Sequence, residues 1–386
     1  MILDNLTILD WVFLGTLCLL FLLQFYFYVR YMAAPARRMR KKSGVSDQDS
    51  DLPGVSVIVC AHNESENLSN YLQALLTQNY PKYEVIVVDD GSEDNTRDVI
   101  EQYMVNDPRL HMTFVPYGAR VGSTKKLALT LGAKAAQYDY LLLTDADCTP
   151  ESSRWIRSMM AGFADNKALV LGFGAYFYEK GHVNRLMRYD TLFNGLHYLG
   201  AALSGHPYMG VGRNLAYKKS LFFESGGFTR LMTNKAGDDD LFVNHVATKA
   251  NTAVVVSRDS FTWSLAKKTM KEWWQQKRRH ISASPAYRTG TKARLAFEPI
   301  TRGLFYLAVL GTILYQLFVA HSPLSIPLLA AVGLFLFRWI LQTAILNVSA
   351  RRMGLHRFHM MSVLWFDITL PLVNLYMLII PKKYKW

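Results

Sequence analysis

Three short apolar runs decide the fold of this chain. VSVIVCAHNE begins at Val55, YEVIVVDDGS begins at Tyr83 and YDYLLLTDADC begins at Tyr138. Runs of this length, rich in Val, Ile and Leu, are typical of buried strands, which we predict over Val55–Cys60, Tyr83–Val88 and Tyr138–Thr144. Helical patterns separate the runs, and strands that alternate with helices form right-handed βαβ units. The sequence therefore predicts an α/β domain with a parallel sheet.

Acidic residues follow two of these strands. Asp89 and Asp90 end the second run, and Asp145 and Asp147 end the third. In open parallel sheets, ligands bind beyond the carboxyl ends of the strands. The first pair also fits a plain turn or helix cap, because Gly91 follows it. The second pair has one intervening residue, so both carboxylates can converge on a hard divalent cation, for which a diphosphate is the natural partner.

Apolar segments long enough to cross a bilayer flank this domain. The first, Ile8–Val29, is followed by a cluster of arginines and lysines, which predicts that the chain downstream of it is cytoplasmic. Gly303–Ala320 and Ile326–Val348 are two further predicted spans. Ser362–Ile380 contains an acid and a proline, so a full span and a re-entrant or interfacial helix both stay open.

These segments predict four parts. Residues 1–30 form an N-terminal membrane anchor and residues 31–52 a basic, polar linker. Residues 53–296 form a cytoplasmic catalytic domain, which is long enough for a full α/β core. Residues 297–386 form a C-terminal membrane region that contains the spans 303–320 and 326–348 and the third apolar segment, 362–380.

The composition fits a membrane protein. Of the 386 residues, 51% are hydrophobic and 19% are charged, which excludes a disordered chain. Cys18, Cys60 and Cys148 are too few and too scattered for a disulfide framework or a zinc cluster. The net charge of +13 gathers beside the apolar runs. We therefore expect contact with the anionic lipids of a bacterial plasma membrane and not with nucleic acid.

The motifs and their order resemble a known family. VSVIVCAHNE, VVDDGSEDNT and TDADC are similar to motifs of the nucleotide-sugar glycosyltransferases of family 2. That resemblance implies the A-type glycosyltransferase fold, a Rossmann-like nucleotide-diphospho-sugar transferase domain. Tyr208–Phe228 resembles the family's acceptor-side segment, and GDDDL from Gly237 resembles its acidic element. QKRRH from Gln276 is similar to the QxxRW motif of membrane-integrated polysaccharide synthases and ceramide glucosyltransferase-like enzymes, but His280 stands in place of the Trp.

On the donor side, the resemblance implies a nucleotide-sugar substrate with UDP as the nucleotide. The residues that would bind the nucleotide and its phosphates lie at the strand ends and in the basic element that follows: Cys60, Ala61, Asn63, Glu64, Asp90, Lys125 and Asp145. The resemblance also implies a divalent cofactor, Mg²⁺ or Mn²⁺. Asp147 would be its direct ligand, and Asp145 would lie beside it.

On the acceptor side, the resemblance implies a carboxylate base and inversion at the anomeric carbon. Asp238 aligns with the family's catalytic Asp, but Gly237 replaces the usual Glu, so Asp239 stays an alternative base. Gln276, Arg279 and His280 would contact the acceptor or the diphosphate from an amphipathic helix that lies against the membrane.

The sequence leaves several functions open, which differ mainly in the acceptor. The sequence favours a hexosyltransferase that moves a sugar to a lipid-linked or growing glycan acceptor at the membrane. A processive polysaccharide synthase with its own translocation path is the main alternative. A nucleotidylyltransferase would not need membrane spans, and a catalytically silent scaffold would not need the acidic motifs. The donor sugar, the linkage, partner subunits and the oligomeric state are encoded by none of these motifs.

Overall fold

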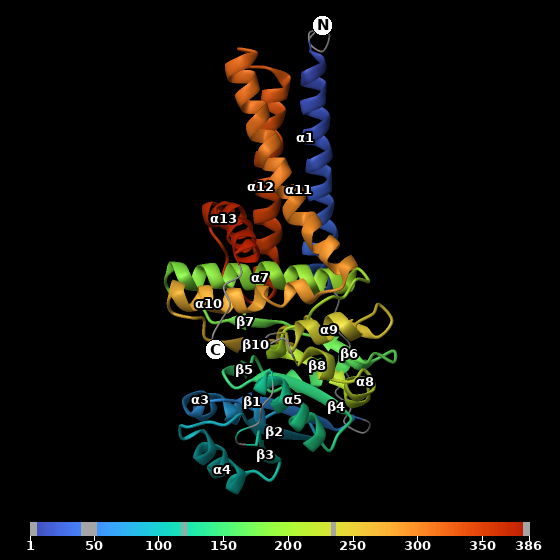
Figure 1. Ribbon diagram of the computed structural model, residues 1–386, viewed down its shortest axis with the longest axis vertical. Helices are drawn as coiled ribbons and strands as arrows, with labels where there is room; N and C mark the ends of the chain where they lie inside the picture. The colour runs from blue at the N-terminus through green and yellow to red at the C-terminus, as the bar shows by residue number, and fades with distance from the viewer. Residues whose placement is uncertain (1–5, 40–51, 117, 119–121, 233–236, 381–386) are drawn as a thin grey trace.

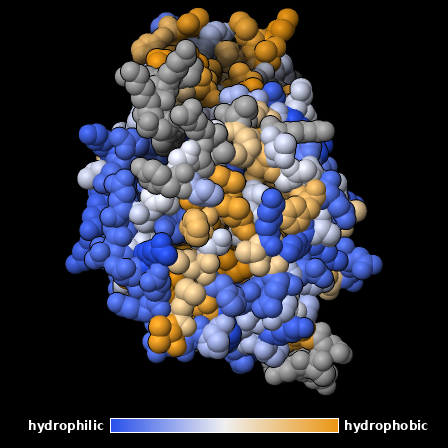
Figure 2. Space-filling view, turned by 60° about the horizontal axis from the view of Figure 1, so that its bottom comes forward, coloured by the Kyte–Doolittle hydropathy of each residue, from blue (hydrophilic) through white to orange (hydrophobic). Residues whose placement is uncertain are grey.

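The computed structural model describes residues 6–39, 52–116, 118, 122–232 and 237–380. Figure 1 shows three tiers along the long axis of the molecule. A bundle of long helices stands at one end, a layer formed by helices α7 (His182–Leu203) and α10 (Met270–Ile281) lies across the middle, and the sheet domain forms the other end. In Figure 2 the hydrophobic colours cover the bundle end and also run down the middle of the visible face, whereas hydrophilic residues cover the flanks on both sides.

The larger sheet has seven strands in the order β3-β2-β1-β4-β8-β6-β9. The strands are β1 (Val55–Ala61), β2 (Tyr83–Asp89), β3 (Leu110–Phe114), β4 (Tyr140–Asp145), β6 (Leu169–Leu171), β8 (Leu215–Lys218) and β9 (Thr252–Val254). The three predicted strands are confirmed, and they pair in parallel. The sheet also contains one strand that the sequence did not predict to run in the opposite direction, because β8 is antiparallel to both of its neighbours.

Helices cover both faces of the central strands, which explains why their sequences are apolar without alternation. Val55, Val57 and Val59 of β1 share a buried cluster with residues of α3 (Ser65–Leu76) and α6 (Trp155–Met160). Ile58 points to the other face and shares a cluster with residues of α5 (Thr124–Ala135). Helix α4 (Thr96–Asn106) packs beside α3 and β3. The α/β fold class is therefore confirmed.

A second, three-stranded sheet lies between the larger sheet and the helix layer (Figure 1). Its order is β5 (Cys148–Pro150), β10 (Thr262–Ser264) and β7 (Gly174–Tyr176), with β10 antiparallel to β5 and parallel to β7. The chain enters β5 directly after Asp147, so this sheet fixes the end of the acidic motif.

Short helices complete the sheet domain. They are α8 (Lys219–Glu224), α9 (Asp240–Val246) and the 3-10 turns η3 (Ala161–Phe163), η4 (Gly212–Asn214), η5 (Thr229–Leu231), η6 (Arg258–Ser260) and η7 (Ser284–Ala286). Two of them matter for the site, because η4 and the start of α9 lie at the carboxyl edge of the larger sheet.

Among the residues that the structure describes, four helices are long and apolar enough to cross a membrane. They are α1 (Ile8–Phe27), α11 (Thr289–Leu314), α12 (Ile326–Arg352) and α13 (Met360–Ile379). The π-helical turn η2 (Tyr28–Met32) and helix α2 (Ala34–Met39) continue α1, and the π-helical turn η8 (Tyr315–Val319) continues α11. Leu17, Phe305, Val309 and Ala331 form the buried contact between α1, α11 and α12.

Two predicted boundaries differ from the structure. Helix α11 begins at Thr289, 14 residues before the predicted span at 303, so the predicted domain boundary at 297 falls inside a helix. The helix extends because its polar residues Glu298 and Arg302 are buried and paired. The predicted linker is partly helical, since α2 is ordered and packs on α7, while residues 40–51 lie outside the described residues.

Helix α13 lies obliquely at the lower part of the bundle, above α7 (Figure 1). Its start lies beside the middle of α12, because Trp339 Nε1 donates to the Met360 carbonyl at 3.1 Å. Near its end, the Tyr376 ring contacts the Trp274 ring of α10, with 6.0 Å between centroids. A helix in this position descends toward the α7–α10 layer instead of standing parallel to α1, α11 and α12.

A buried polar network joins α13 to the other membrane helices. Asp367 of α13 accepts from Arg302 of α11 at 2.6 Å and from Arg338 of α12 at 2.9 Å. Arg302 also pairs with Glu298 at 2.9 Å, and Arg338 Nη2 donates to Gln24 of α1 at 3.0 Å. Charges at membrane depth persist only when they are paired in this way. The network therefore fixes the position of α13.

Asp367→Asn should destabilise the protein strongly. The substitution leaves two buried guanidinium groups with one remaining carboxylate between them, and breaking a buried ion pair costs about 3–5 kcal/mol. Chemical unfolding in detergent micelles measures the loss of unfolding free energy. Asp98→Asn, at an exposed position on α4, is the matched control and should change stability by less than about 0.5 kcal/mol. Equal stability of the two variants would contradict the importance of the network.

Candidate functional site

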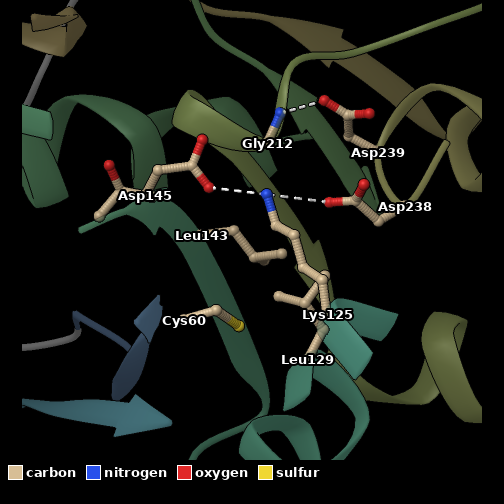
Figure 3. Close-up of a pocket in the computed structure, with 9 residues that line it drawn as sticks. Cys60, Lys125, Leu129, Leu143, Asp145, Gly212, Asp238 and Asp239 are labelled. Carbon is tan, nitrogen blue, oxygen red and sulfur yellow. Dashed lines mark hydrogen bonds and ion pairs between the residues drawn. The ribbon is translucent and has the colours of Figure 1, made fainter. Parts of the chain in front are cut away.

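A pocket opens at the carboxyl edge of the larger sheet, where β1 and β4 end. It is lined by nine residues: Cys60, Lys125, Leu129, Leu143, Thr144, Asp145, Gly212, Asp238 and Asp239. Figure 3 shows the acidic side chains on opposite sides of the Lys125 amine. Five of the predicted site residues therefore lie together, although they come from segments up to 179 residues apart in sequence, from Cys60 to Asp239.

Lys125 lies at the centre of the pocket. It belongs to the first turn of α5, which Ser123 caps by accepting from the Lys126 backbone N–H. Its Nζ lies 3.0 Å from Asp145 Oδ1 and 3.3 Å from Asp238 Oδ2 (Figure 3). Burial opposes its charge, but the two carboxylates outweigh burial and raise the pKa of Lys125 well above its usual value. The amine is therefore a fixed cation between the two acidic motifs.

The three consecutive aspartates before α9 have different partners. Asp239 accepts from the Gly212 backbone N–H at 2.6 Å and from the Asp240 backbone N–H at 2.8 Å. Burial, then the charges of Asp238 and Asp240, raise the pKa of Asp239 to about 7. Burial also acts on Asp238, but Lys125 lowers the pKa of Asp238 below its usual value. Both acids thus line the pocket, one paired with a cation and one held by backbone donors.

The departure at Gly237 has a structural reason. Its φ of +83° lies in the left-handed region that favours glycine, and a Cβ there would lie 2.5 Å from the Leu241 side chain. A glutamate at this position would strain the turn that carries the acids into the pocket. The Gly is therefore part of how this chain builds the turn.

Asp145, Asp147 and Cys148 offer a candidate metal site at the end of β4. One ligand atom from each lies within 4.8 Å of the others. Burial, then the charges of Asp147 and Asp145, raise the pKa of Cys148 well above its usual value, and its thiol donates to Asp147 Oδ1 at 3.3 Å. A neutral thiol is a poor ligand, so the available donors are the two carboxylates. Hard oxygen donors fit Mg²⁺ or Mn²⁺, which Asp147 and Asp145 would hold.

Arg213 is a site residue that the motif analysis did not single out. It lies in η4, and its guanidinium stacks 4.4 Å from the centroid of the Tyr176 ring and donates to Ser264 Oγ at 3.0 Å. Burial opposes its charge, but Tyr176, Cys148, Asp147 and Asp145 together raise the pKa of Arg213. This fixed cation faces the acidic motif. Its only sequence signal was its place after the two glycines of YMGVGR.

The remaining nucleotide-side residues lie in two adjacent loops after β1 and β2. The Asp90 backbone N–H donates to the Ala61 carbonyl at 2.8 Å, and the Asn63 side-chain carbonyl accepts from Glu93 N–H at 2.8 Å. Asn63 has a φ of +56°, in the left-handed region, and Glu64, the N-cap residue of α3, makes no side-chain capping hydrogen bond. Burial raises the pKa of Asp90. Burial also raises the pKa of Glu64, and the hydrogen bond with Asn67 opposes that rise without cancelling it.

The predicted amphipathic helix is confirmed as α10, and it lies against the small sheet and α7. Gln276 donates to Tyr176 Oη at 3.1 Å, and Lys277 pairs with Asp190 of α7 at 2.7 Å. Arg279 and His280 reach solvent. The helix thus brings Gln276 to the same tyrosine on which Arg213 stacks.

Two tryptophans of α10 and a lysine just before the helix contact different parts of the molecule. The Trp273 ring is buried against Trp274, and Trp274 contacts Tyr376 of α13, so this pair anchors α10 to the membrane region. Lys267 lies close enough to Glu64 and Asp147 to oppose the rise in pKa that burial causes in each.

Comparison with known proteins assigns this domain to a family. Residues 56–229 match the family described as Glycosyl transferase family 2. The resemblance predicted from the motifs is therefore confirmed for residues 56–229, which lie within the sheet domain.

Three relatives illustrate the match. A probable glycosyltransferase, YdaM of Bacillus subtilis, is 27% identical over 234 residues, which cover 59% of this chain and 54% of that protein. A poly-beta-1,6-N-acetyl-D-glucosamine synthase of Staphylococcus epidermidis is 33% identical over 103 residues, 27% of this chain and 24% of that protein. Glycosyltransferase AglE of Haloferax volcanii is 31% identical over 147 residues, 38% of this chain and 47% of that protein. The chain spans about half the length, or less, of these relatives.

The fold is shared with a solved structure. The mannosyltransferase PcManGT of Pyrobaculum calidifontis, in complex with GDP-Man and Mn²⁺, superposes with a TM-score of 0.56 at 20% identity, covering 90% of this chain and 99% of that one. At this identity the likeness confirms the A-type glycosyltransferase fold alone.

The pH dependence of activity should distinguish the two candidate bases. A base must be ionised to accept a proton, and Asp239 has a raised pKa of about 7. If Asp239 is the base, the turnover number should rise with pH, about tenfold per unit below pH 6, and level off above about pH 8. A radiometric transfer assay from pH 5 to pH 9 measures this limb.

Variants of each acid complete the test. Asp239→Asn should abolish the limb together with most of the activity if Asp239 is the base. If Asp238 is the base, the wild type should show a limb well below pH 5, because Lys125 lowers the pKa of Asp238. A profile that is flat from pH 5 to pH 9, together with an inactive Asp238→Asn variant, would therefore identify Asp238 as the base.

Proposed function

We propose that this protein is an inverting hexosyltransferase that moves a sugar from a nucleoside-diphosphate sugar, with UDP as the nucleotide, to a lipid-linked or growing glycan acceptor at the membrane. One observation supports the proposal above all others. The acidic motif at the end of β4 and the acidic motif before α9 face each other across Lys125 in one pocket.

On the donor side, the charges suit a nucleoside diphosphate. Cations at Lys125 and Arg213 flank the acidic pair of β4 and would bind phosphate oxygens directly. A divalent cation held by Asp145 and Asp147 would act as a Lewis acid on the diphosphate. The loops after β1 and β2, with Ala61, Asn63, Glu64 and Asp90, would hold the base and ribose, and Cys60 closes the floor of the pocket.

On the acceptor side, the proposal assigns the proton to a carboxylate. The attacking hydroxyl forms the new bond to the anomeric carbon, while the bond from that carbon to the diphosphate breaks and its electron pair leaves with the nucleotide. The hydroxyl proton passes to Asp238 or Asp239. Attack from the face opposite the diphosphate inverts the anomeric centre. Gln276, Arg279 and His280 of α10 would guide the acceptor at the membrane side of the pocket.

We propose a cytoplasmic location for the catalytic domain, in a bacterial plasma membrane. Arg37 of α2 and Arg351 and Arg352 at the end of α12 mark the ends of membrane helices that face this domain. An excess of arginine and lysine marks the cytoplasmic ends of membrane helices. The charge pattern therefore supports this orientation.

The experiment is donor turnover by the full chain in nanodiscs, with UDP-, GDP- and TDP-sugars, Mg²⁺ or Mn²⁺, and a membrane lipid extract. Metal-dependent release of nucleotide with one donor supports the proposal and identifies the sugar. Asp147→Asn should lower this rate at least about 100-fold, because it removes a charge that holds the metal.

Asp139→Asn is the matched control, because this exposed acid precedes β4, at the opposite end of the strand from Asp147. It should leave the rate unchanged. Equal rates for Asp147→Asn and the wild type would contradict the assigned donor site. Absence of turnover with every donor would favour the scaffold function.

The size of the labelled product separates the two acceptor classes. A glycolipid bearing one added sugar supports single addition. A high-mass polymer supports the processive alternative, which the similarity to a poly-beta-1,6-N-acetyl-D-glucosamine synthase favours.

A further inference from the structure

The connection between α10 and α11 is fastened to the helix that carries the catalytic acids. Tyr287 Oη donates to Asp240 Oδ2 at 2.7 Å. The Arg288 backbone N–H donates to Asn244 Oδ1 at 3.0 Å, and Asn244 Nδ2 donates to Thr291 Oγ1 at 3.3 Å. Three successive contacts therefore join α9 to the segment that leads into a membrane helix.

Asp240 is fully engaged by the protein itself. Only 8% of the residue is exposed, and its second oxygen accepts from the Leu241 backbone N–H at 2.7 Å. It does not line the pocket, unlike Asp238 and Asp239. Asp240 can therefore act on the reaction only through its neighbours.

The Tyr287 side chain, which donates to Asp240, is buried as well. The residue is 7% exposed, and its ring packs against the Tyr208 ring with 6.5 Å between centroids. The charged groups that act on Asp240 are Asp238 and Lys126, and Asp240 in turn acts on Asp239. Burial and the charge of Asp238 raise the pKa of Asp240, the hydrogen bond from the Tyr287 phenol opposes that rise, and the resulting pKa is about 6.

We propose that Tyr287 is a positioning residue of the transfer reaction, which holds Asp240 and thereby sets the orientation and charge of the two acids in the pocket. The inference rests on the proposed transferase function. Since Tyr287 lies between α10 and α11, it also links the acids to α10 and to the membrane helix α11.

Tyr287→Phe tests the proposal, because it removes only the phenol oxygen. The turnover number should fall about tenfold, and the KM for the donor should stay within about twofold, since the donor-side residues are untouched. The acid limb of the pH profile should move to higher pH by about 0.5–1 unit, because the three coupled aspartates lose a donor that stabilises their ionised form.

Two further measurements separate positioning from general stability. Tyr80→Phe is the matched control, since its buried phenol donates to the Pro53 carbonyl at 2.7 Å in a part of the sheet domain distant from the pocket. It should leave turnover and the pH limb unchanged. In an Asp240→Asn background, Tyr287→Phe should cause no further change in turnover, because the phenol acts through Asp240.

The outcomes decide between the two hypotheses. If the wild type turns over no donor, the proposed function fails before Tyr287 is tested. If the wild type is active and Tyr287→Phe matches it in turnover and pH limb, the positioning role is overturned. A variant that loses donor binding and thermal stability together, with no shift of the pH limb, also overturns it and leaves Tyr287 as a folding residue.

Discussion

Burial of the central strands on both faces is the constraint on which the site depends. Side chains of β1 alternate between the layer formed by α3 and α6 and the layer formed by α5, so ionised groups fit only where a strand ends. The parallel pairing of β1 with β2 and β4 then places those ends at one edge. Lys125 enters the same edge from the first turn of α5 and joins acids that are far apart in the chain. The packing of the sheet, and not closeness in sequence, thus brings the charged site residues together.

The helix layer connects this edge to the membrane. Lys277 of α10 pairs with Asp190 of α7, and α7 is joined to α12 by the contact of Gln342 Nε2 with Tyr189 Oη at 3.3 Å. Tyr176 lies beneath that layer and contacts both Gln276 and Arg213. A short path of direct contacts therefore leads from the buried network of the membrane helices to the cations beside the acidic motif.

The sequence predicts those parts of the fold that carry a long local pattern. The three central strands were found to within two residues, because their runs of four to six consecutive buried residues leave a clear signal. Strands β6, β7, β9 and β10 were missed, since three residues define no periodicity. The start of α11 was missed because Glu298 and Arg302 look like surface residues, whereas Arg302 is buried and pairs both with Glu298 and with Asp367, more than 60 positions later. Arg213 and Tyr287 were missed for the same reason, as their partners lie far away in sequence.

The oblique course of α13 leaves α1, α11 and α12 as the upright bundle, and these three pack directly on one another. Three helices in direct contact leave no lumen between them in the part of the chain that the structure describes. A glycolipid product would need none, because it can diffuse away sideways within its own leaflet. A long hydrophilic polymer would have to leave by a route other than the axis of this three-helix contact. The tilt of one helix thus bears on whether export and synthesis can reside in the same polypeptide.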